Sequence, residues 1–416
     1  MTERTDSAQV TPSAPTSTTG GRAVAAYGIA ATVAFCLLVV GSNIPGPLLP
    51  VYRDRLDLST FTVTALFAVY LVGLVATFTV VAHSRLPRHS TRVLPIAVAL
   101  VFAGDVALLA GNHSVAWLFV GRVLVGIAVG LGTGAAATIV LATRGERGRA
   151  IAATGTLLGS FLGLLASAVV ADLLPGPTTT IYCIHMALLV AAAVALAWTH
   201  HRSRTTVAHL IRGPEHESAI PTDLPAQADV QRYPRRVRLA GFALGTAGWA
   251  IGGVVVGLLP TVVTDMTGSG SIIVTSLAPI VLIGVACAAP RIVASVPSPV
   301  SAVAIGVGAV LCFVGVWTSS LPVILVCCVA WGAGQGFAYG NGLKIVTAGL
   351  RPVDQGRIAS QYASIAYGFT SILSVAIGSI ATAAGMTVGL GFAAAVFVVL
   401  CGVTIGLGYR RWPARI

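Results

Sequence analysis

Long apolar blocks separated by short polar connections form the main pattern of this chain. Each block is about 20 residues long, the length at which a helix crosses a hydrocarbon core of roughly 30 Å. Inside lipid such blocks become helices, because a helix satisfies its own backbone hydrogen bonds. The pattern predicts twelve transmembrane helices, over Val24–Pro50, Thr62–Ala82, Val93–Gly111, Val115–Ala142, Ile151–Ala171, Thr180–Thr199, Leu239–Pro260, Ser271–Ala289, Val300–Thr318, Leu321–Ala348, Ile358–Ala383 and Thr387–Tyr409.

The eighth block is the weakest of the twelve. It runs directly into Pro290 and Arg291, which interrupt the apolar pattern. If this block does not cross the membrane, the number of helices is eleven.

Composition supports lipid as the solvent for most of the chain. Of the 416 residues, 56% are hydrophobic and only 9% are charged. That leaves too few polar side chains to cover a water-soluble protein of this size. We therefore expect an all-α integral protein of the cell membrane.

The net charge of +12 first suggests nucleic-acid binding, but the positions of the basic residues give another explanation. With the amino terminus in the cytoplasm, 21 of the 25 lysines and arginines fall in cytoplasmic segments, two fall outside (Arg53 and Arg55) and two fall within helices (Arg122 and Lys344). This asymmetry follows the positive-inside rule. It predicts that both termini are cytoplasmic, that the basic segments contact anionic lipid headgroups, and that nucleic acid is no partner.

A polar, proline-containing stretch divides the chain into two sets of six helices. We expect a disordered cytoplasmic tail over residues 1–22, a six-helix bundle over 23–199, a cytoplasmic linker over 200–238, a second six-helix bundle over 239–410 and a short tail over 411–416.

The two halves share signals at a constant offset, which indicates an internal repeat. Gly126, Gly130 and Gly134 in the fourth block recur as Gly332, Gly336 and Gly340 in the tenth, an offset of 206. The following loops repeat an acidic-x-Gly-Arg pattern, at Glu146–Arg149 and Asp354–Arg357, an offset of 208. Glycines at every fourth position give a helix a smooth face, which favours close packing and also leaves room for a solute. A further ladder, Gly155, Gly159, Gly163 and Ser167, is expected to pack against the other half of the chain.

Several motifs resemble the major facilitator superfamily over nearly the whole membrane-embedded chain. The segment Asn43–Tyr52 with Leu66–Tyr70 is similar to the first and second helices of bacterial drug and sugar efflux members. Gly121–Gly126 resembles the arginine-containing motif of the fourth helix, and Gly332–Arg357 resembles the tenth helix with its following loop. The resemblance implies two six-helix bundles that act as one monomeric chain.

The chain also departs from the family pattern. In the loop after the second block, Ser84 and Pro87 replace an aspartate and a glycine of the family signature, which puts the usual cytoplasmic latch at this loop in doubt. Gly163-Leu164 stands where antiporter members carry Gly-Pro.

The resemblance implies which residues line a substrate cavity and which form gates. The expected cavity residues are Asn43, Tyr70, Arg122, Trp249, Gln335, Tyr339, Asn341 and Tyr367, with Gln361 and Tyr362 as further candidates. The expected residues of the cytoplasmic gate loops are Arg85, Arg88, Glu146, Arg149, Asp354 and Arg357. A cavity rich in aromatic groups and poor in charge suits an amphiphilic or weakly basic organic solute.

Ionisable side chains at membrane depth are functional candidates, because an unpaired charge there is costly. Asp105 and Arg122 fall at similar depth in neighbouring blocks, which makes an ion pair between them one expectation. Asp105 is either a structural partner of Arg122, a side chain close enough to the outer surface to be hydrated, or the carrier of a coupling proton. Lys344 lies near the inner end of its helix, where its side chain reaches the cytoplasm.

These features predict a secondary transporter, with proton-coupled efflux of a drug-like or metabolite compound as the first hypothesis. Proton-coupled uptake of a sugar or organic acid stays open, and a membrane-embedded transferase is a more remote alternative. The chain lacks a Gly-x-x-x-x-Gly-Lys-Ser/Thr phosphate loop, so we expect no ATP hydrolysis by this chain. The seven cysteines are not spaced like metal or redox motifs, and we expect neither a metal nor a cofactor.

Overall fold

The computed structural model describes residues 18–82, 84, 86–144, 146–212, 233–350 and 352–408, which form helices and connections without a strand. In the first half the helices are α1 (Thr18–Asn43), α2 (Pro45–Leu56), α3 (Thr60–Ala82), the short 3₁₀ helix η1 (Leu86–His89), α4 (Ser90–Ala110), α5 (Val115–Arg144), α6 (Glu146–Leu173) and α7 (Pro177–Arg212). In the second half they are α8 (Arg235–Thr267), α9 (Ile272–Thr275), α10 (Leu277–Ile292), α11 (Ser298–Trp317), α12 (Leu321–Thr347), α13 (Pro352–Ala384) and α14 (Met386–Gly408).

The helices confirm the predicted fold class of an all-α multi-pass membrane protein. Among the described residues, eleven spans are long and apolar enough to cross a membrane, with α1 and α2 counted as one span of 36 residues. The twelfth is α10, which has only 16 residues and corresponds to the eighth predicted block. The block that the sequence marked as weakest is therefore the short one.

Two of the predicted blocks contain breaks with a clear chemical cause. The first block divides at Ile44, because Pro45 and Pro47 lack the amide hydrogens that would continue the backbone hydrogen bonds of α1. Proline is tolerated in the first turn of a helix, so α2 begins at once and runs beyond the predicted end at Pro50. In the eighth block, α9 and α10 are separated at Ser276, three residues before Pro279.

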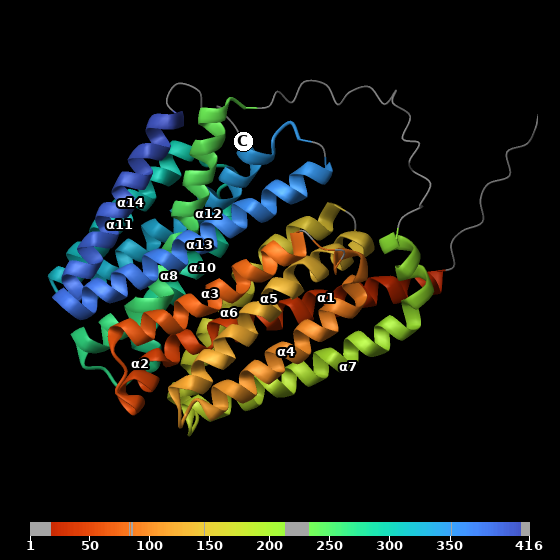
Figure 1. Cartoon of the computed structure of the whole chain (residues 1–416), viewed down its shortest axis with the longest axis horizontal. Coiled ribbons are helices and arrows are strands. Elements are labelled where there is room, and N and C mark those ends of the chain that lie inside the picture. Colours follow the sequence, from red (N-terminus) through yellow and green to blue (C-terminus); the bar gives the residue numbers. More distant parts are fainter. Residues whose placement is uncertain are drawn as a thin grey trace, which may run out of the picture.

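The two halves of the chain pack side by side, as Figure 1 shows with the first half in red to yellow-green and the second in green to blue. Across the boundary α3 packs along α13, α6 packs on α10, and α2 packs on α8. The short helices α2 and α9 lie at the same end of the bundle and also contact each other. We call this end of the molecule the α2 end.

The glycine ladders of α5 and α12 pack against equivalent helices in the two halves. A Cβ atom at Gly126 would overlap the carbonyl oxygen of Tyr70 in α3, and one at Gly332 would overlap that of Leu282 in α10. The third glycine of each ladder is open: Gly134 has only an ordinary contact with Val81, and Gly340 has no neighbour within 4 Å. The fourth helix of each set of six thus packs closely on the second, as an internal repeat predicts.

The ladder of α6 corrects an expectation. A Cβ atom at Gly159 would lie 3.0 Å from the carbonyl oxygen of Cys36, one at Gly163 would meet that of Val40, and Ser167 donates a hydrogen bond to the carbonyl of Ile44 over 2.8 Å. All three partners belong to the first half, so this face packs on α1 and not on the other half of the chain. Phe161 of α6 lies outside this ladder and contacts the second half at Gly284 of α10.

The observed helices extend past three of the predicted domain boundaries. Helix α1 begins at Thr18, within the segment 1–22 that was expected to be a disordered tail. Helix α7 continues to Arg212, well past the expected start of the linker at residue 200, and α8 begins at Arg235, before its expected end at residue 238. Residues 1–17, 213–232 and 409–416 lie outside the described part of the chain, so the two tails and most of the linker stay predictions.

Candidate functional site

A cavity of about 370 Å³ lies between the two halves of the chain. Its lining comes from α1, α3, α5 and α6 of the first half and from α8, α10, α12 and α13 of the second. On α1 the lining stops at Asn43, and neither α2 nor α9 contributes a residue. The cavity therefore occupies the middle of the bundle and the part away from the α2 end.

Six of the eight expected cavity residues line this cavity, namely Asn43, Tyr70, Trp249, Gln335, Tyr339 and Tyr367. They come from five different helices and are brought together only by the packing of the two halves. That the cavity binds a substrate stays a prediction.

Three aromatic rings form one group in the cavity wall. The ring centroid of Trp249 lies 4.8 Å from that of Tyr339 and 4.9 Å from that of Tyr367, the latter in an edge-on arrangement. Tyr362 supports this group from behind, because its hydroxyl donates a hydrogen bond to the carbonyl of Tyr339 over 2.8 Å. Tyr362 itself does not line the cavity. The group offers a ligand flat apolar surfaces with polar edges.

The polar groups of the cavity are uncharged. Asn43 uses its amide to donate hydrogen bonds to the Val39 carbonyl at 2.9 Å and to the Ser160 hydroxyl at 3.2 Å. Gln335 is 4% exposed, and its Oε1 atom has no hydrogen-bond partner among the described residues. An acceptor buried without a donor is costly, so Gln335 is ready to accept a hydrogen bond from a bound solute or from water. None of the described residues that line the cavity is Asp, Glu, Lys, Arg or His.

Arg122 does not line the cavity but lies behind its wall. Its Nε atom donates to the carbonyl of Leu66 at 3.0 Å, and its Nη1 atom donates to the carbonyl of Ser42 at 2.9 Å. Its guanidinium also lies 4.6 Å from the ring centroid of Tyr70, a cation–π distance. Arg122 thus joins α5 to α1 and α3, directly behind a cavity residue.

The expected ion pair between Asp105 and Arg122 is wrong. Asp105 is fully buried, and its Oδ2 atom lies 2.6 Å from Nδ1 of His185 in α7. The two residues were expected to meet because they lie at similar depth, but the side chain of Arg122 turns toward α1 and α3. The other ring nitrogen of His185 lies 3.0 Å from the carbonyl oxygen of Leu37 in α1.

His185 is a functional candidate that the sequence reasoning missed. It lies inside the predicted block Thr180–Thr199, so it is an ionisable group at membrane depth in the same sense as Asp105. The rule that selected Asp105 would also have selected His185. What the sequence does not contain is the pairing across 80 positions.

The other expected site residues fall elsewhere. Asn341 faces away from the cavity and donates a hydrogen bond to the carbonyl of Val296 at 2.9 Å. Lys344 is exposed near the end of α12, and that its side chain reaches the cytoplasm stays a prediction. Of the gate residues, Arg85 and the side chains of Arg88, Glu146, Arg149, Asp354 and Arg357 lie outside the described residues, so their role stays a prediction.

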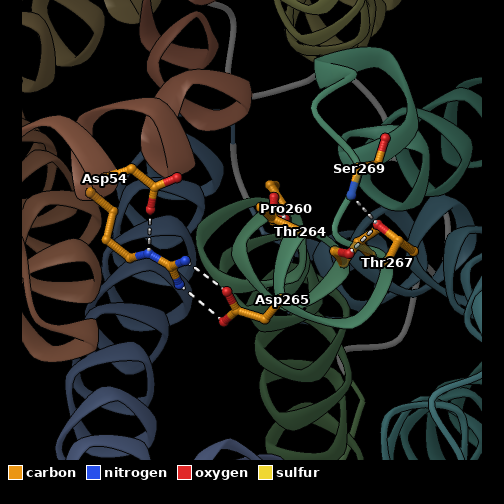
Figure 2. A network of polar contacts seen from close by, with 8 residues as sticks. Asp54, Pro260, Thr264, Asp265, Thr267 and Ser269 are labelled. Atoms are coloured by element: carbon orange, nitrogen blue, oxygen red, sulfur yellow. Dashed lines mark hydrogen bonds and ion pairs between the residues drawn. The ribbon is translucent and has the colours of Figure 1, made fainter.

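Polar contacts join the halves at the α2 end, and two of those among the described residues involve carboxylate groups. Arg53 of α2 donates to both carboxylate oxygens of Asp265 in α8, over 2.6 and 3.0 Å, and Figure 2 shows Asp54 and Asp265 on opposite sides of this guanidinium group. Asp172 of α6 accepts hydrogen bonds from the backbone of Ile272 at 2.6 Å and Ile273 at 2.9 Å, at the start of α9. We call these two contacts the outer clamp.

Comparison with known structures gives several matches across nearly the whole chain. The peptide transporter POT is 13% identical with a TM-score of 0.70, and the match covers 92% of this chain and 94% of that one. The nucleoside transporter NupG is 14% identical with a TM-score of 0.63, covering 92% of this chain and 99% of that one. The POT family transporter PepTSo is 13% identical with a TM-score of 0.68, covering 94% and 99%. At such low identity these likenesses establish the fold alone.

Comparison with curated proteins gives no match. The family comparison is decisive, because the model described as Major Facilitator Superfamily matches residues 31–375. That range includes the cavity, the pair of Asp105 with His185 and both contacts of the outer clamp. The chain belongs to the major facilitator superfamily.

Proposed function

We propose that this chain is a secondary active transporter that exports a small organic solute across the cell membrane in exchange for protons. The observation that carries the proposal is a cavity between two repeated halves, confined to one side of a set of contacts that tie those halves together. Such an arrangement suits alternating access, in which two bundles rock about a central site.

The distribution of basic residues assigns the sides of the membrane in this proposal. Because the basic segments are placed in the cytoplasm, the α2 end faces outward and the cavity faces the cytoplasm. In this assignment the outer clamp closes the external side. The conformation is then the one that takes up a solute from inside the cell.

The lining of the cavity supports a neutral or weakly basic amphiphilic solute. It presents the rings of Trp249, Tyr339 and Tyr367, a free acceptor on Gln335, and no charged side chain among the described residues. A highly charged solute would find no counter-charge there and would lose its hydration. The similar structures carry titles that name a peptide and a nucleoside transporter, and at 13–14% identity we do not transfer either substrate.

The same proposal makes Asp105 the carrier of the coupling proton. The carboxyl group is fully buried away from solvent and lies in the first half of the chain, outside the cavity. A buried carboxyl changes charge only when a proton enters or leaves, so its protonation is able to bias two conformations.

Expression in a host that lacks its own exporters tests this function. Resistance to a panel of amphiphilic compounds, with lower cellular accumulation, is the expected result, and Trp249→Ala is expected to abolish it. Trp317, an exposed tryptophan outside the cavity, provides the matched control in Trp317→Ala. Growth of the host on a supplied nutrient, without protection from any compound, would instead support uptake.

A further inference from the structure

We propose that Asp105 and His185 form a site for one exchangeable proton, and that the occupancy of this site is sensed by α1. The inference deepens the proposed proton coupling, because it names the partner of Asp105 and the element that connects the pair to the cavity. It rests on the geometry of the pair and of α1, which no motif in the sequence predicts.

The hydrogen-bond partners of His185 fix the number of protons. A backbone carbonyl accepts and never donates, so the contact of Nε2 with the Leu37 carbonyl requires a hydrogen on Nε2. The contact of 2.6 Å between Nδ1 and Oδ2 of Asp105 must then hold one further hydrogen, on either atom. The pair is therefore neutral as a unit, whether as imidazolium with carboxylate or as imidazole with carboxylic acid.

Release of this shared proton changes the net charge of a pair that is buried away from solvent. Proton transfer to water breaks the hydrogen bond between Nδ1 and Oδ2 and leaves a neutral imidazole beside a carboxylate, with a net charge of −1. His185 is 1% exposed and Asp105 is 0% exposed, and Oδ1 of Asp105 has no partner among the described residues. An isolated negative charge in such surroundings is strongly disfavoured, so the proton-free pair favours a conformation in which water reaches it.

The other ionisable groups around the pair, among the described residues, keep a fixed charge at neutral pH. Within the described part of the chain, Tyr52 of α2 and Tyr182 of α7 are the other ionisable groups that interact with Asp105, and their hydroxyl oxygens lie 3.5 Å apart. Tyrosine hydroxyls keep their protons at neutral pH. On α5, Arg122 donates hydrogen bonds to two backbone carbonyls, and from α1 the Leu37 carbonyl and Gly41 face His185.

Helix α1 separates the pair from the cavity. With 3.6 residues per turn, Leu37 and Gly41 lie on one face of α1, while Val39, Ser42 and Asn43 lie on the opposite face and line the cavity. A Cβ atom at Gly41 would overlap the imidazole of His185, so this glycine is what lets the ring reach the helix. After the break at Ile44, α1 connects directly to α2, and Arg53 of α2 belongs to the outer clamp.

Asp105→Asn provides a sharp test, because it mimics the proton-loaded pair. An asparagine amide donates a hydrogen to Nδ1 of neutral His185 and cannot lose it at neutral pH. We therefore expect this variant to stay closed at the α2 end at every pH. In the wild type, raising the pH is expected to open that end.

Hydrogen-exchange mass spectrometry on the full chain in lipid nanodiscs, without any solute, measures this directly. The exchange of α2 and α9 in the wild type is expected to rise with pH several-fold more than in Asp105→Asn at the same pH. Asp57→Asn removes an exposed carboxylate near the α2 end and is expected to behave as the wild type. Identical pH responses of the wild type and Asp105→Asn would overturn the proposal.

A second measurement does not depend on whether the Asp105→Asn variant folds. Nitrogen NMR of the wild type, labelled at its eight histidines, reports the protonation of His185. The His185→Gln variant identifies the His185 signal, because that signal is missing from its spectrum. We expect the Nδ1 signal of His185 to change between acidic and alkaline pH, because loss of the shared proton removes either the hydrogen on Nδ1 or the hydrogen bond that Nδ1 accepts. A signal that stays constant would show a purely structural pair and overturn the proposal. Because neither measurement uses a solute, failure to find a transported compound would count against the proposed function and leave this inference standing.

Discussion

Nη2 of Arg53 lies 2.6 Å from Oδ1 of Asp265, and the two residues are 212 positions apart in the sequence. This contact joins α2 of the first half to α8 of the second and is bidentate, the strongest geometry for an arginine with a carboxylate. We expect Arg53→Gln to weaken the closed state of the α2 end by about 1 kcal/mol, or about fivefold in population, because the pair is partly exposed to water. Hydrogen exchange in α2 and at the end of α8 provides the measurement.

Charge reversal separates the ion pair from other effects of these substitutions. Arg53→Asp and Asp265→Arg should each increase exchange at the α2 end, and the double variant should return it toward the wild-type level. If the double variant is as open as either single one, the ion pair does not hold the halves together.

Asp172 is the second contact of the outer clamp, and we expect it to act independently of Arg53. Its carboxylate accepts hydrogen bonds from the amides of Ile272 and Ile273 and from the hydroxyl of Ser271. An asparagine has only one acceptor oxygen, so Asp172→Asn loses part of this set. The effects of Asp172→Asn and Arg53→Gln on exchange should add in the double variant, and a double variant no more open than Arg53→Gln alone would argue against two separate contacts.

The glycine ladders allow a prediction with an internal control in each half. Gly126→Ala and Gly332→Ala push a methyl group into a neighbouring helix backbone, and each is expected to destabilise the protein by about 1–3 kcal/mol. Gly134→Ala and Gly340→Ala add the same methyl group where space is open and are expected to change stability little. Thermal unfolding in detergent, followed by cysteine-reactive dye or circular dichroism, distinguishes the two groups. Equal losses in all four variants would contradict equivalent packing in the two halves.

Much of the fold could be predicted from the sequence because lipid imposes a simple rule on helix length and polarity. The twelve blocks, the repeat at an offset of 206 and the weak eighth block all follow from that rule and from glycine spacing. The breaks at Ile44 and Ser276 were harder to predict from the sequence. A proline ends the helix before it, but it is also tolerated in the first turn of the next helix. The α6 ladder shows the same limit, because spacing defines a smooth face but not which helix covers it.

The candidate site was only partly predictable for a related reason. Helix position places Trp249, Gln335 and Tyr339 near the middle of the bundle, and they do line the cavity. Arg122 and Asp105 have the same depth, but side-chain direction decides their partners, and that depends on how α1, α3 and α7 rotate around them. A charged residue in a membrane helix thus indicates a partner without naming it.

Gln335 supplies a prediction about solute recognition. Its Oε1 atom is buried without a donor, so a solute with an N–H or O–H group gains a hydrogen bond there. Gln335→Leu keeps a similar volume and removes the acceptor, and we expect a loss of about tenfold in apparent affinity for such solutes and little change for analogues without the donor group. Competition measurements with matched pairs of compounds test this, and an equal loss for both members of a pair would contradict it.

The proposed function requires that the two halves separate at the α2 end for a solute to leave. It is tested most directly by linking Arg53→Cys to Asp265→Cys with a reducible bifunctional thiol reagent, and then measuring transport in vesicles of a compound against which the protein gives resistance. We predict that linking stops transport, that reduction restores it, and that the reagent leaves the wild type active. Transport that continues through the linked protein would contradict the account.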